Sequence, residues 1–128
     1  MKTLLLIYGA ATLLHFTHNA EFVADYPNLP ATWSRMDIYL AWLAMTAVGI
    51  AGWFLASRGY RAIGLVLQAA YAALGLDSLG HYVLAPMSAH TFAMNSTILV
   101  EVTAAGLVMV EVVRQAVRAA RGRVGELR

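Results

Sequence analysis

The hydrophobic positions of the chain fall into four long runs separated by short polar segments. The runs cover approximately residues 3–23, 37–56, 62–84 and 91–113. Each is close to the roughly 20 residues that an α-helix needs to cross the hydrocarbon core of a bilayer. The segments between the runs contain helix breakers and turn residues: two prolines in YPNLPATWSR, a glycine in SRGYR and a third proline in APMSAH. The pattern predicts an all-α, integral membrane four-helix transmembrane bundle that forms a single domain.

The composition supports a membrane protein, because 60% of the 128 residues are hydrophobic and only 12% are charged. A typical soluble domain carries about 25% charged residues. The net charge of +2 does not indicate a nucleic-acid partner, because five of the nine basic residues follow residue 113, where they flank the last run. The chain has no cysteine, which excludes a disulfide, a thiolate metal ligand and a cysteine nucleophile.

The basic residues gather on one side of the predicted bundle. On that side lie Lys2, Arg58, Arg61 and the arginines of the tail, residues 114–128. The opposite loops hold only one basic residue, Arg35, and two aspartates lie near it in the sequence. By the positive-inside rule, we expect both termini in the cytoplasm, and we expect the membrane to be the bacterial inner membrane. The tail should continue the last helix as a basic amphipathic helix at the cytoplasmic surface.

Ionisable side chains interrupt three of the four runs at similar depths. At a rise of 1.5 Å per residue they lie about 18 to 28 Å from the cytoplasmic ends, in the outer half of the membrane. The residues concerned are His15, His18, Glu21, Asp77, His81 and Glu101. Such residues are costly in lipid and usually face a bundle interior or a wet cavity. We therefore expect these side chains to converge on one cavity, with Glu21 at its mouth.

A transition-metal site is the first hypothesis for this cluster. Imidazole binds zinc, iron and copper, and carboxylates can complete the coordination sphere. A His-x-x-His pair in the first helix and an Asp-x-x-x-His pair in the third each place two side chains one turn apart. The expected metal ligands are His15, His18, Glu21 and His81, and the expected catalytic groups are Glu101 and Asp77. A metal with an open coordination position would make the protein an enzyme for a small or lipid-like substrate.

Three other functions fit the same residues. The first is metal-free acid–base catalysis, as in a helical membrane isomerase, in which Glu101 and a histidine exchange protons with a lipid, a sterol or a quinone. The second is haem b held by histidines of two helices, such as His15 and His81, although the carboxylates nearby disfavour it. The third is an accessory subunit of a larger membrane complex, or a homo-oligomer, in which the polar groups face a partner.

Other polar and aromatic residues of the outer half have ordinary structural explanations. Asp37 is expected to be an N-cap or first-turn acid of the second helix, where the helix dipole favours a negative charge. We expect His90 to lie in a loop at the outer interface. Tyr26 is expected to belong to the belt of aromatic residues that membrane proteins place at the headgroups.

Overall fold

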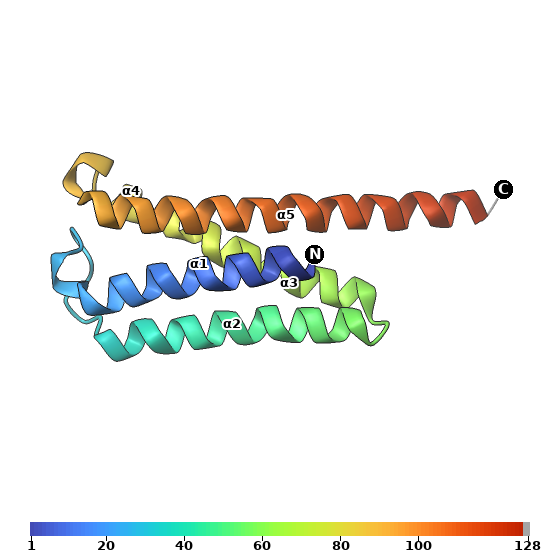
Figure 1. The fold of residues 1–128 in the computed structure, drawn as a ribbon, viewed down its shortest axis with the longest axis horizontal. Coiled ribbons are helices and arrows are strands. Elements are labelled where there is room, and N and C mark those ends of the chain that lie inside the picture. Colours follow the sequence, from blue (N-terminus) through green and yellow to red (C-terminus); the bar gives the residue numbers. More distant parts are fainter. Residues whose placement is uncertain (127–128) are drawn as a thin grey trace.

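The computed structural model describes residues 1–126, with side chains as far as Gly122. Four long helices run side by side, and the prediction of an all-α chain is confirmed for the described residues (Figure 1). They are α1 (Lys2–Glu21), α2 (Arg35–Ser57), α3 (Arg61–Leu76) and α5 (Phe92–Glu126). The short elements are η1 (Val23–Asp25), η2 (Asp77–Leu79), α4 (Gly80–Leu84) and η3 (Met87–Ala89). Leu127 and Arg128, at the end of the predicted tail, lie outside the described residues.

The four long helices form a ring in which each packs against two others. α1 contacts α2 and α5, and α3 contacts the same two helices, so α1 and α3 face each other across the bundle. The N-terminus and the α2–α3 turn lie at one end of the bundle, and α5 extends past this end as one continuous helix (Figure 1). The α1–α2 connection and α4 lie at the other end.

Local signals in the sequence explain where α2 begins and ends. The Asp37 backbone N–H donates to Ser34 Oγ at 3.3 Å, and the Ser34 N–H donates to Asp37 Oδ2 at 2.9 Å. This capping box satisfies backbone donors at the start of the helix and confirms the role expected for Asp37. After the helix, Gly59 adopts a φ of 92°, a left-handed conformation that glycine takes without steric cost, and the chain turns into α3.

Two tyrosines fill the centre of the bundle between α1 and α3. The fully buried Tyr8 hydroxyl donates to the backbone oxygen of Tyr71 at 2.8 Å, and the two rings are 4.4 Å apart. Glycines make room for both rings. A Cβ added at Gly49 would lie 2.5 Å from the Tyr71 ring, and one added at Gly75 would collide with the Tyr8 hydroxyl. Gly75 therefore allows the close approach of α1 to α3, and Gly49 allows that of α2 to α3.

The third helical segment differs from the continuous helix predicted over residues 62–84. α3 ends at Leu76, a 3₁₀ turn covers Asp77–Leu79, and α4 follows. Proline does not cause the interruption, because the segment contains none. Instead, the turn coincides with a hydrogen bond to α5, in which Ser78 Oγ donates to Glu101 Oε2 at 2.7 Å. Short 3₁₀ stretches between helical segments often mark functional positions.

Three helical segments are long and apolar enough to cross a membrane: Arg35–Ser57, Arg61–Leu84 and Phe92–Gly122. α1 is not among them, because His15, His18 and Asn19 lower the hydropathy of its last turns. The outer surface of the bundle carries many large apolar side chains. Leu6 on α1 and Val66 on α3, for example, are more than half exposed, as expected of side chains that face lipid.

Replacing Gly75 with alanine should destabilise the bundle by roughly 1 to 3 kcal/mol, the usual cost of overpacking a core. The added methyl group must displace the Tyr8 ring, which has no free space. Thermal unfolding of the purified protein in detergent measures the effect. Gly106→Ala is the matched control, because a Cβ at Gly106 meets nothing within 4 Å. Equal unfolding temperatures for the two variants would contradict this explanation of the core.

Candidate functional site

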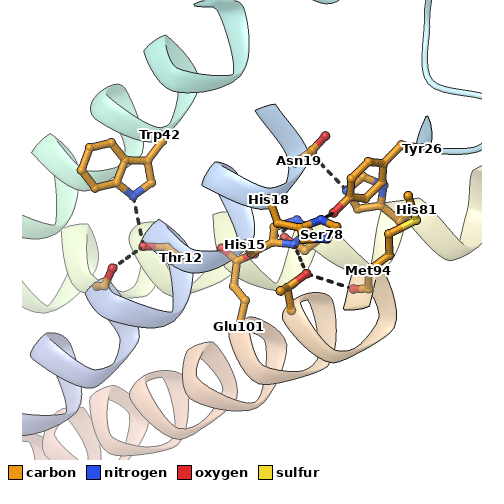
Figure 2. Close-up of polar contacts among 12 residues, drawn as sticks. Thr12, His15, His18, Asn19, Tyr26, Trp42, Ser78, His81, Met94 and Glu101 are labelled. Atoms are coloured by element: carbon orange, nitrogen blue, oxygen red, sulfur yellow. Dashed lines mark hydrogen bonds and ion pairs between the residues drawn. The ribbon is translucent and has the colours of Figure 1, made fainter. Parts of the chain in front are cut away.

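His15 of α1 and Glu101 of α5 meet inside the bundle (Figure 2). His15 Nε2 lies 3.7 Å from Glu101 Oε2, and their side chains are 2% and 0% exposed. The other ring nitrogen, Nδ1, lies 3.3 Å from the hydroxyl of Thr97, one turn before Glu101 on α5. A carboxyl group and an imidazole thus share a site that is closed to the surroundings. Glu101, which has no cation within reach on its own helix, meets its partner on α1.

The hydrogen bonds around this pair favour one shared proton. The Thr97 hydroxyl donates to the Met94 backbone oxygen at 3.0 Å, so the Thr97 oxygen is left to accept from His15 Nδ1. In a neutral imidazole, a proton on Nδ1 leaves a lone pair on Nε2, which faces Glu101. A lone pair facing a carboxylate is unfavourable, and an unpaired buried charge is costly. A carboxylic acid at Glu101, or an imidazolium at His15, satisfies both groups.

Ser78 and His81 complete the inner part of the site from the broken third helix. The Ser78 hydroxyl donates to Glu101 Oε2, whereas Glu101 Oε1 is buried with no hydrogen-bond partner. The His81 ring lies 5.4 Å from the His15 ring, and its Nε2 is 3.4 Å from the side-chain nitrogen of Asn19. Asn19 Oδ1 and His81 Nδ1 are also buried without partners. Such buried groups without partners are uncommon in folded proteins.

Tyr26 enters the site from the α1–α2 connection, which corrects the prediction that it belongs to the interfacial aromatic belt. It is 3% exposed, and its ring lies 5.0 Å from that of His81. Its hydroxyl is 2.9 Å from His18 Nδ1. Burial raises the pKa of Tyr26 to about 12, so the phenol is neutral at ordinary pH and can donate to His18. The connection folds back over the site because the Tyr26 ring is buried with Met94 and Ile98 of α5.

His90 lies in the α4–α5 connection, as expected, but it is buried there, at 6% exposure. Its Nδ1 donates to the Pro86 backbone oxygen at 3.1 Å, and its Nε2 has no partner. The His90 ring lies 6.2 Å from the ring of His81. The histidine series His90, His81 and His15 therefore extends from the α4–α5 connection to the buried Glu101.

The structure brings together some of the predicted site residues and separates others. His15, His81 and Glu101 converge, and His18 joins them through Tyr26. Asp77 is exposed, but it lines the same pocket as His15 and His81. Glu21 is held elsewhere. Its Oε1 lies 2.6 Å from Arg35 Nη2 and accepts a hydrogen bond from Tyr39 at 2.8 Å, because the start of α2 lies beside the end of α1.

The predicted set of site residues left out four polar groups of the site: Asn19, Tyr26, Ser78 and Thr97. Two of them carried a usable signal, since Asn19 is four residues after His15 and Thr97 is four residues before Glu101. This spacing places each on the helix face of the residue that was identified. Ser78 and Tyr26 carried no such signal, because one lies in an unpredicted turn and the other in a loop.

An open pocket of about 570 Å³ borders the cluster. Its polar lining consists of His15, Asn19, Asp77, Ser78 and His81. Its apolar lining includes Leu29, Trp33, Ile38, Met45, Leu74 and Leu84. Glu101 is not a lining residue and lies behind His15 and Ser78. The pocket therefore combines mostly apolar walls with a few convergent polar groups, which is typical of sites for small molecules.

The structure does not gather the four predicted metal ligands into one cluster. Among the described residues, no group of three or more His, Asp or Glu side chains is placed to hold a metal ion. Glu21, one of the predicted ligands, is instead paired with Arg35. Haem between His15 and His81 fits no better. Two histidines that held one haem would each point a ring nitrogen at its iron, whereas the His15 nitrogens face Thr97 and Glu101.

Comparison with known protein families, with curated proteins and with solved structures found no match to this chain.

A double-mutant cycle should show that His15 and Glu101 stabilise each other. His15→Leu leaves a buried carboxyl group without its partner, and such losses cost roughly 3 to 5 kcal/mol. Adding Glu101→Leu should recover part of this loss, because the double variant has no unpaired charge. Chemical unfolding in detergent measures each free energy. If the losses of unfolding free energy in the two single variants simply add in the double variant, the two groups do not interact. The description of them as a pair is then wrong.

Proposed function

We propose that the protein is a metal-free acid–base enzyme of the membrane, which moves a proton within a small, lipid-like molecule. The observation that carries this proposal is the 3.7 Å contact of His15 with the buried Glu101, directly behind the wall of an apolar pocket. The expected reaction is an isomerisation of a lipid, a sterol or a quinone. It takes a substrate proton at one carbon and returns a proton at another.

The proposal includes four transmembrane helices, with α1 as the fourth. α1 packs against α2 and α5, both of which are long and apolar enough to span. Its polar residues His15 and Asn19 are buried against the bundle, whereas Leu6 and Leu14 are exposed. A helix of this kind can cross a bilayer because its ionisable groups face the bundle interior. The basic residues Lys2 and Arg61 favour a cytoplasmic location for the end at which they lie.

The shape of the pocket supports an apolar substrate. Apolar side chains, among them leucine, isoleucine, methionine and tryptophan, form most of its walls. Of its polar lining residues, Asn19 and His81 have buried atoms without a partner. A substrate hydroxyl group would donate to Asn19 Oδ1 and accept from His81 Nδ1, and the hydrocarbon part would stay in contact with the apolar walls. Such a molecule can enter from the bilayer without crossing water.

The side chains have distinct roles in the proposed reaction. His81 lines the pocket with a free Nδ1 and exchanges a proton with the substrate. His15 lines the same pocket beside His81, and its pair with Glu101 keeps a proton available close to His81. The exposed Asp77, also on the pocket wall, can balance charge on His81. One C–H bond breaks, the double bond moves, and a new C–H bond forms, so the reaction needs no oxidant and no reductant.

Deuterium exchange tests this function even though the substrate is not identified. The purified protein is reconstituted with a lipid extract in heavy water, and mass spectrometry identifies any lipid-soluble component that gains carbon-bound deuterium. The wild-type protein should label at least one component. Glu101→Gln should slow labelling by roughly 10²-fold or more, the usual contribution of a general acid or base.

Glu111→Gln is the matched control for this experiment. Glu111 is on the same helix, but its carboxylate accepts from Gln115 and lies far along α5 from the pocket. This variant should label at the wild-type rate. Labelling by Glu101→Gln at the wild-type rate, or no labelled component with any protein, would contradict the proposed function.

A further inference from the structure

Two further pockets lie toward the opposite end of the bundle, where the N-terminus of α1 meets the α2–α3 turn. One is an apolar groove of about 410 Å³, whose lining includes Leu13, Ile50 and Tyr71. The other is a polar pocket of about 310 Å³, lined in part by Arg61, Gln68 and Gln115. Lys2 and Trp53 line both, so the groove and the polar pocket adjoin. Together they form what we term the headgroup–chain site.

The polar pocket is suited to an anion. Lys2 and Arg61 bring two positive charges to its wall, and its lining residues include no acid. A carboxylate close to this wall, that of Glu111, accepts a hydrogen bond from Gln115 at 3.0 Å. Gln115 in turn accepts a long hydrogen bond from Arg61 at 3.5 Å. Arg61 is therefore not in an ion pair among the described residues and can bind a phosphate.

Buried polar atoms in both pockets lack partners. Gln68 is only 1% exposed, and its side-chain oxygen lines the polar pocket without a hydrogen-bond donor. The Thr46 hydroxyl has no partner either, and it lies on the groove. A buried acceptor without a donor is costly. A ligand with a hydroxyl group beside its phosphate would supply the donor that Gln68 lacks.

The groove is suited to a hydrocarbon chain. Its walls are predominantly apolar, with leucine, isoleucine and tryptophan as their large side chains, and it lies between the exposed faces of α1 and α2. Gly9 keeps the groove open, because a Cβ at this position would meet only the Tyr71 hydroxyl, at 3.9 Å. A chain in the groove would cover apolar surface from Leu6 to Leu13 and would continue directly from an anionic group beside Lys2.

We propose that the headgroup–chain site binds an anionic phospholipid with a hydroxyl-bearing headgroup. The phosphate lies between Lys2 and Arg61, the headgroup hydroxyl donates to Gln68, and one acyl chain occupies the groove over Gly9. The site is separate from the His15–Glu101 pair, and the proposal does not depend on the chemistry proposed there. It requires only that the bundle lies in a membrane with Lys2 and Arg61 at the headgroups.

Trp53 provides a probe, because it lines both parts of the site. In a variant with Trp33→Phe and Trp42→Phe, it is the only tryptophan that remains of the chain's three. Phosphatidylglycerol and phosphatidylcholine with the same brominated acyl chains are titrated into the protein in detergent, and the quenching of Trp53 fluorescence is recorded. Phosphatidylglycerol should quench at roughly 20-fold lower concentration, because each basic residue near a lipid surface contributes about fivefold.

Variants separate the two parts of the site. Lys2→Gln and Arg61→Gln should each reduce the preference for phosphatidylglycerol by about fivefold. Arg58→Gln is the matched control, since Arg58 lies near Arg61 but stacks on Phe54, 4.7 Å from the ring centre, and lines neither pocket. Gly9→Leu should weaken quenching by both lipids, whereas Gly106→Leu, at an open position outside the groove, should not.

Equal quenching by the two lipids would overturn the proposal. So would an unchanged preference in Lys2→Gln and Arg61→Gln, or the same loss in Arg58→Gln, which would indicate a general attraction of basic residues to lipid. None of these results bears on deuterium exchange at the His15 site, so the two proposals fail independently.

Discussion

The contact between His15 and Glu101 is the constraint on which the polar end of the bundle depends. A fully buried carboxyl group must have a partner that compensates it, and the nearest ionisable partner comes from another helix. α1 and α5 must therefore keep a fixed register. Ser78 can reach the same carboxyl group only because the third helix is interrupted at Asp77–Leu79. The pocket beside His15 is thus a consequence of how the bundle satisfies one carboxyl group.

The packing of the other half supplies the rigidity that this contact requires. Tyr8 and Tyr71 hold α1 and α3 together through a hydrogen bond and ring contact, in spaces that Gly49 and Gly75 leave open. Proton transfer depends on precise placement of the groups involved. A core closed by large, rigid rings holds His15 at a defined height on α1. The apolar half of the bundle therefore supports the polar half that holds the candidate site.

The helices and part of the candidate site could be predicted from the sequence. Long apolar runs specify helices, and the cost of burying His15, His81 and Glu101 marks them as residues that face one another. The failures have equally specific causes. Glu21 pairs with Arg35 because a loop returns α2 beside the end of α1, and loop paths leave no periodic signal. No proline marks the turn at Ser78 in the sequence, and a tertiary hydrogen bond to Glu101 stabilises this turn.

The state of the shared proton tests the central claim most directly. Infrared spectroscopy of the reconstituted protein detects a protonated carboxyl group, and nitrogen NMR detects a His15 imidazolium. At neutral pH we expect one of these two signals to be present and Glu101→Gln to remove it. An ionised Glu101 beside a neutral His15, with neither signal present, would contradict the claim that the pair holds a proton.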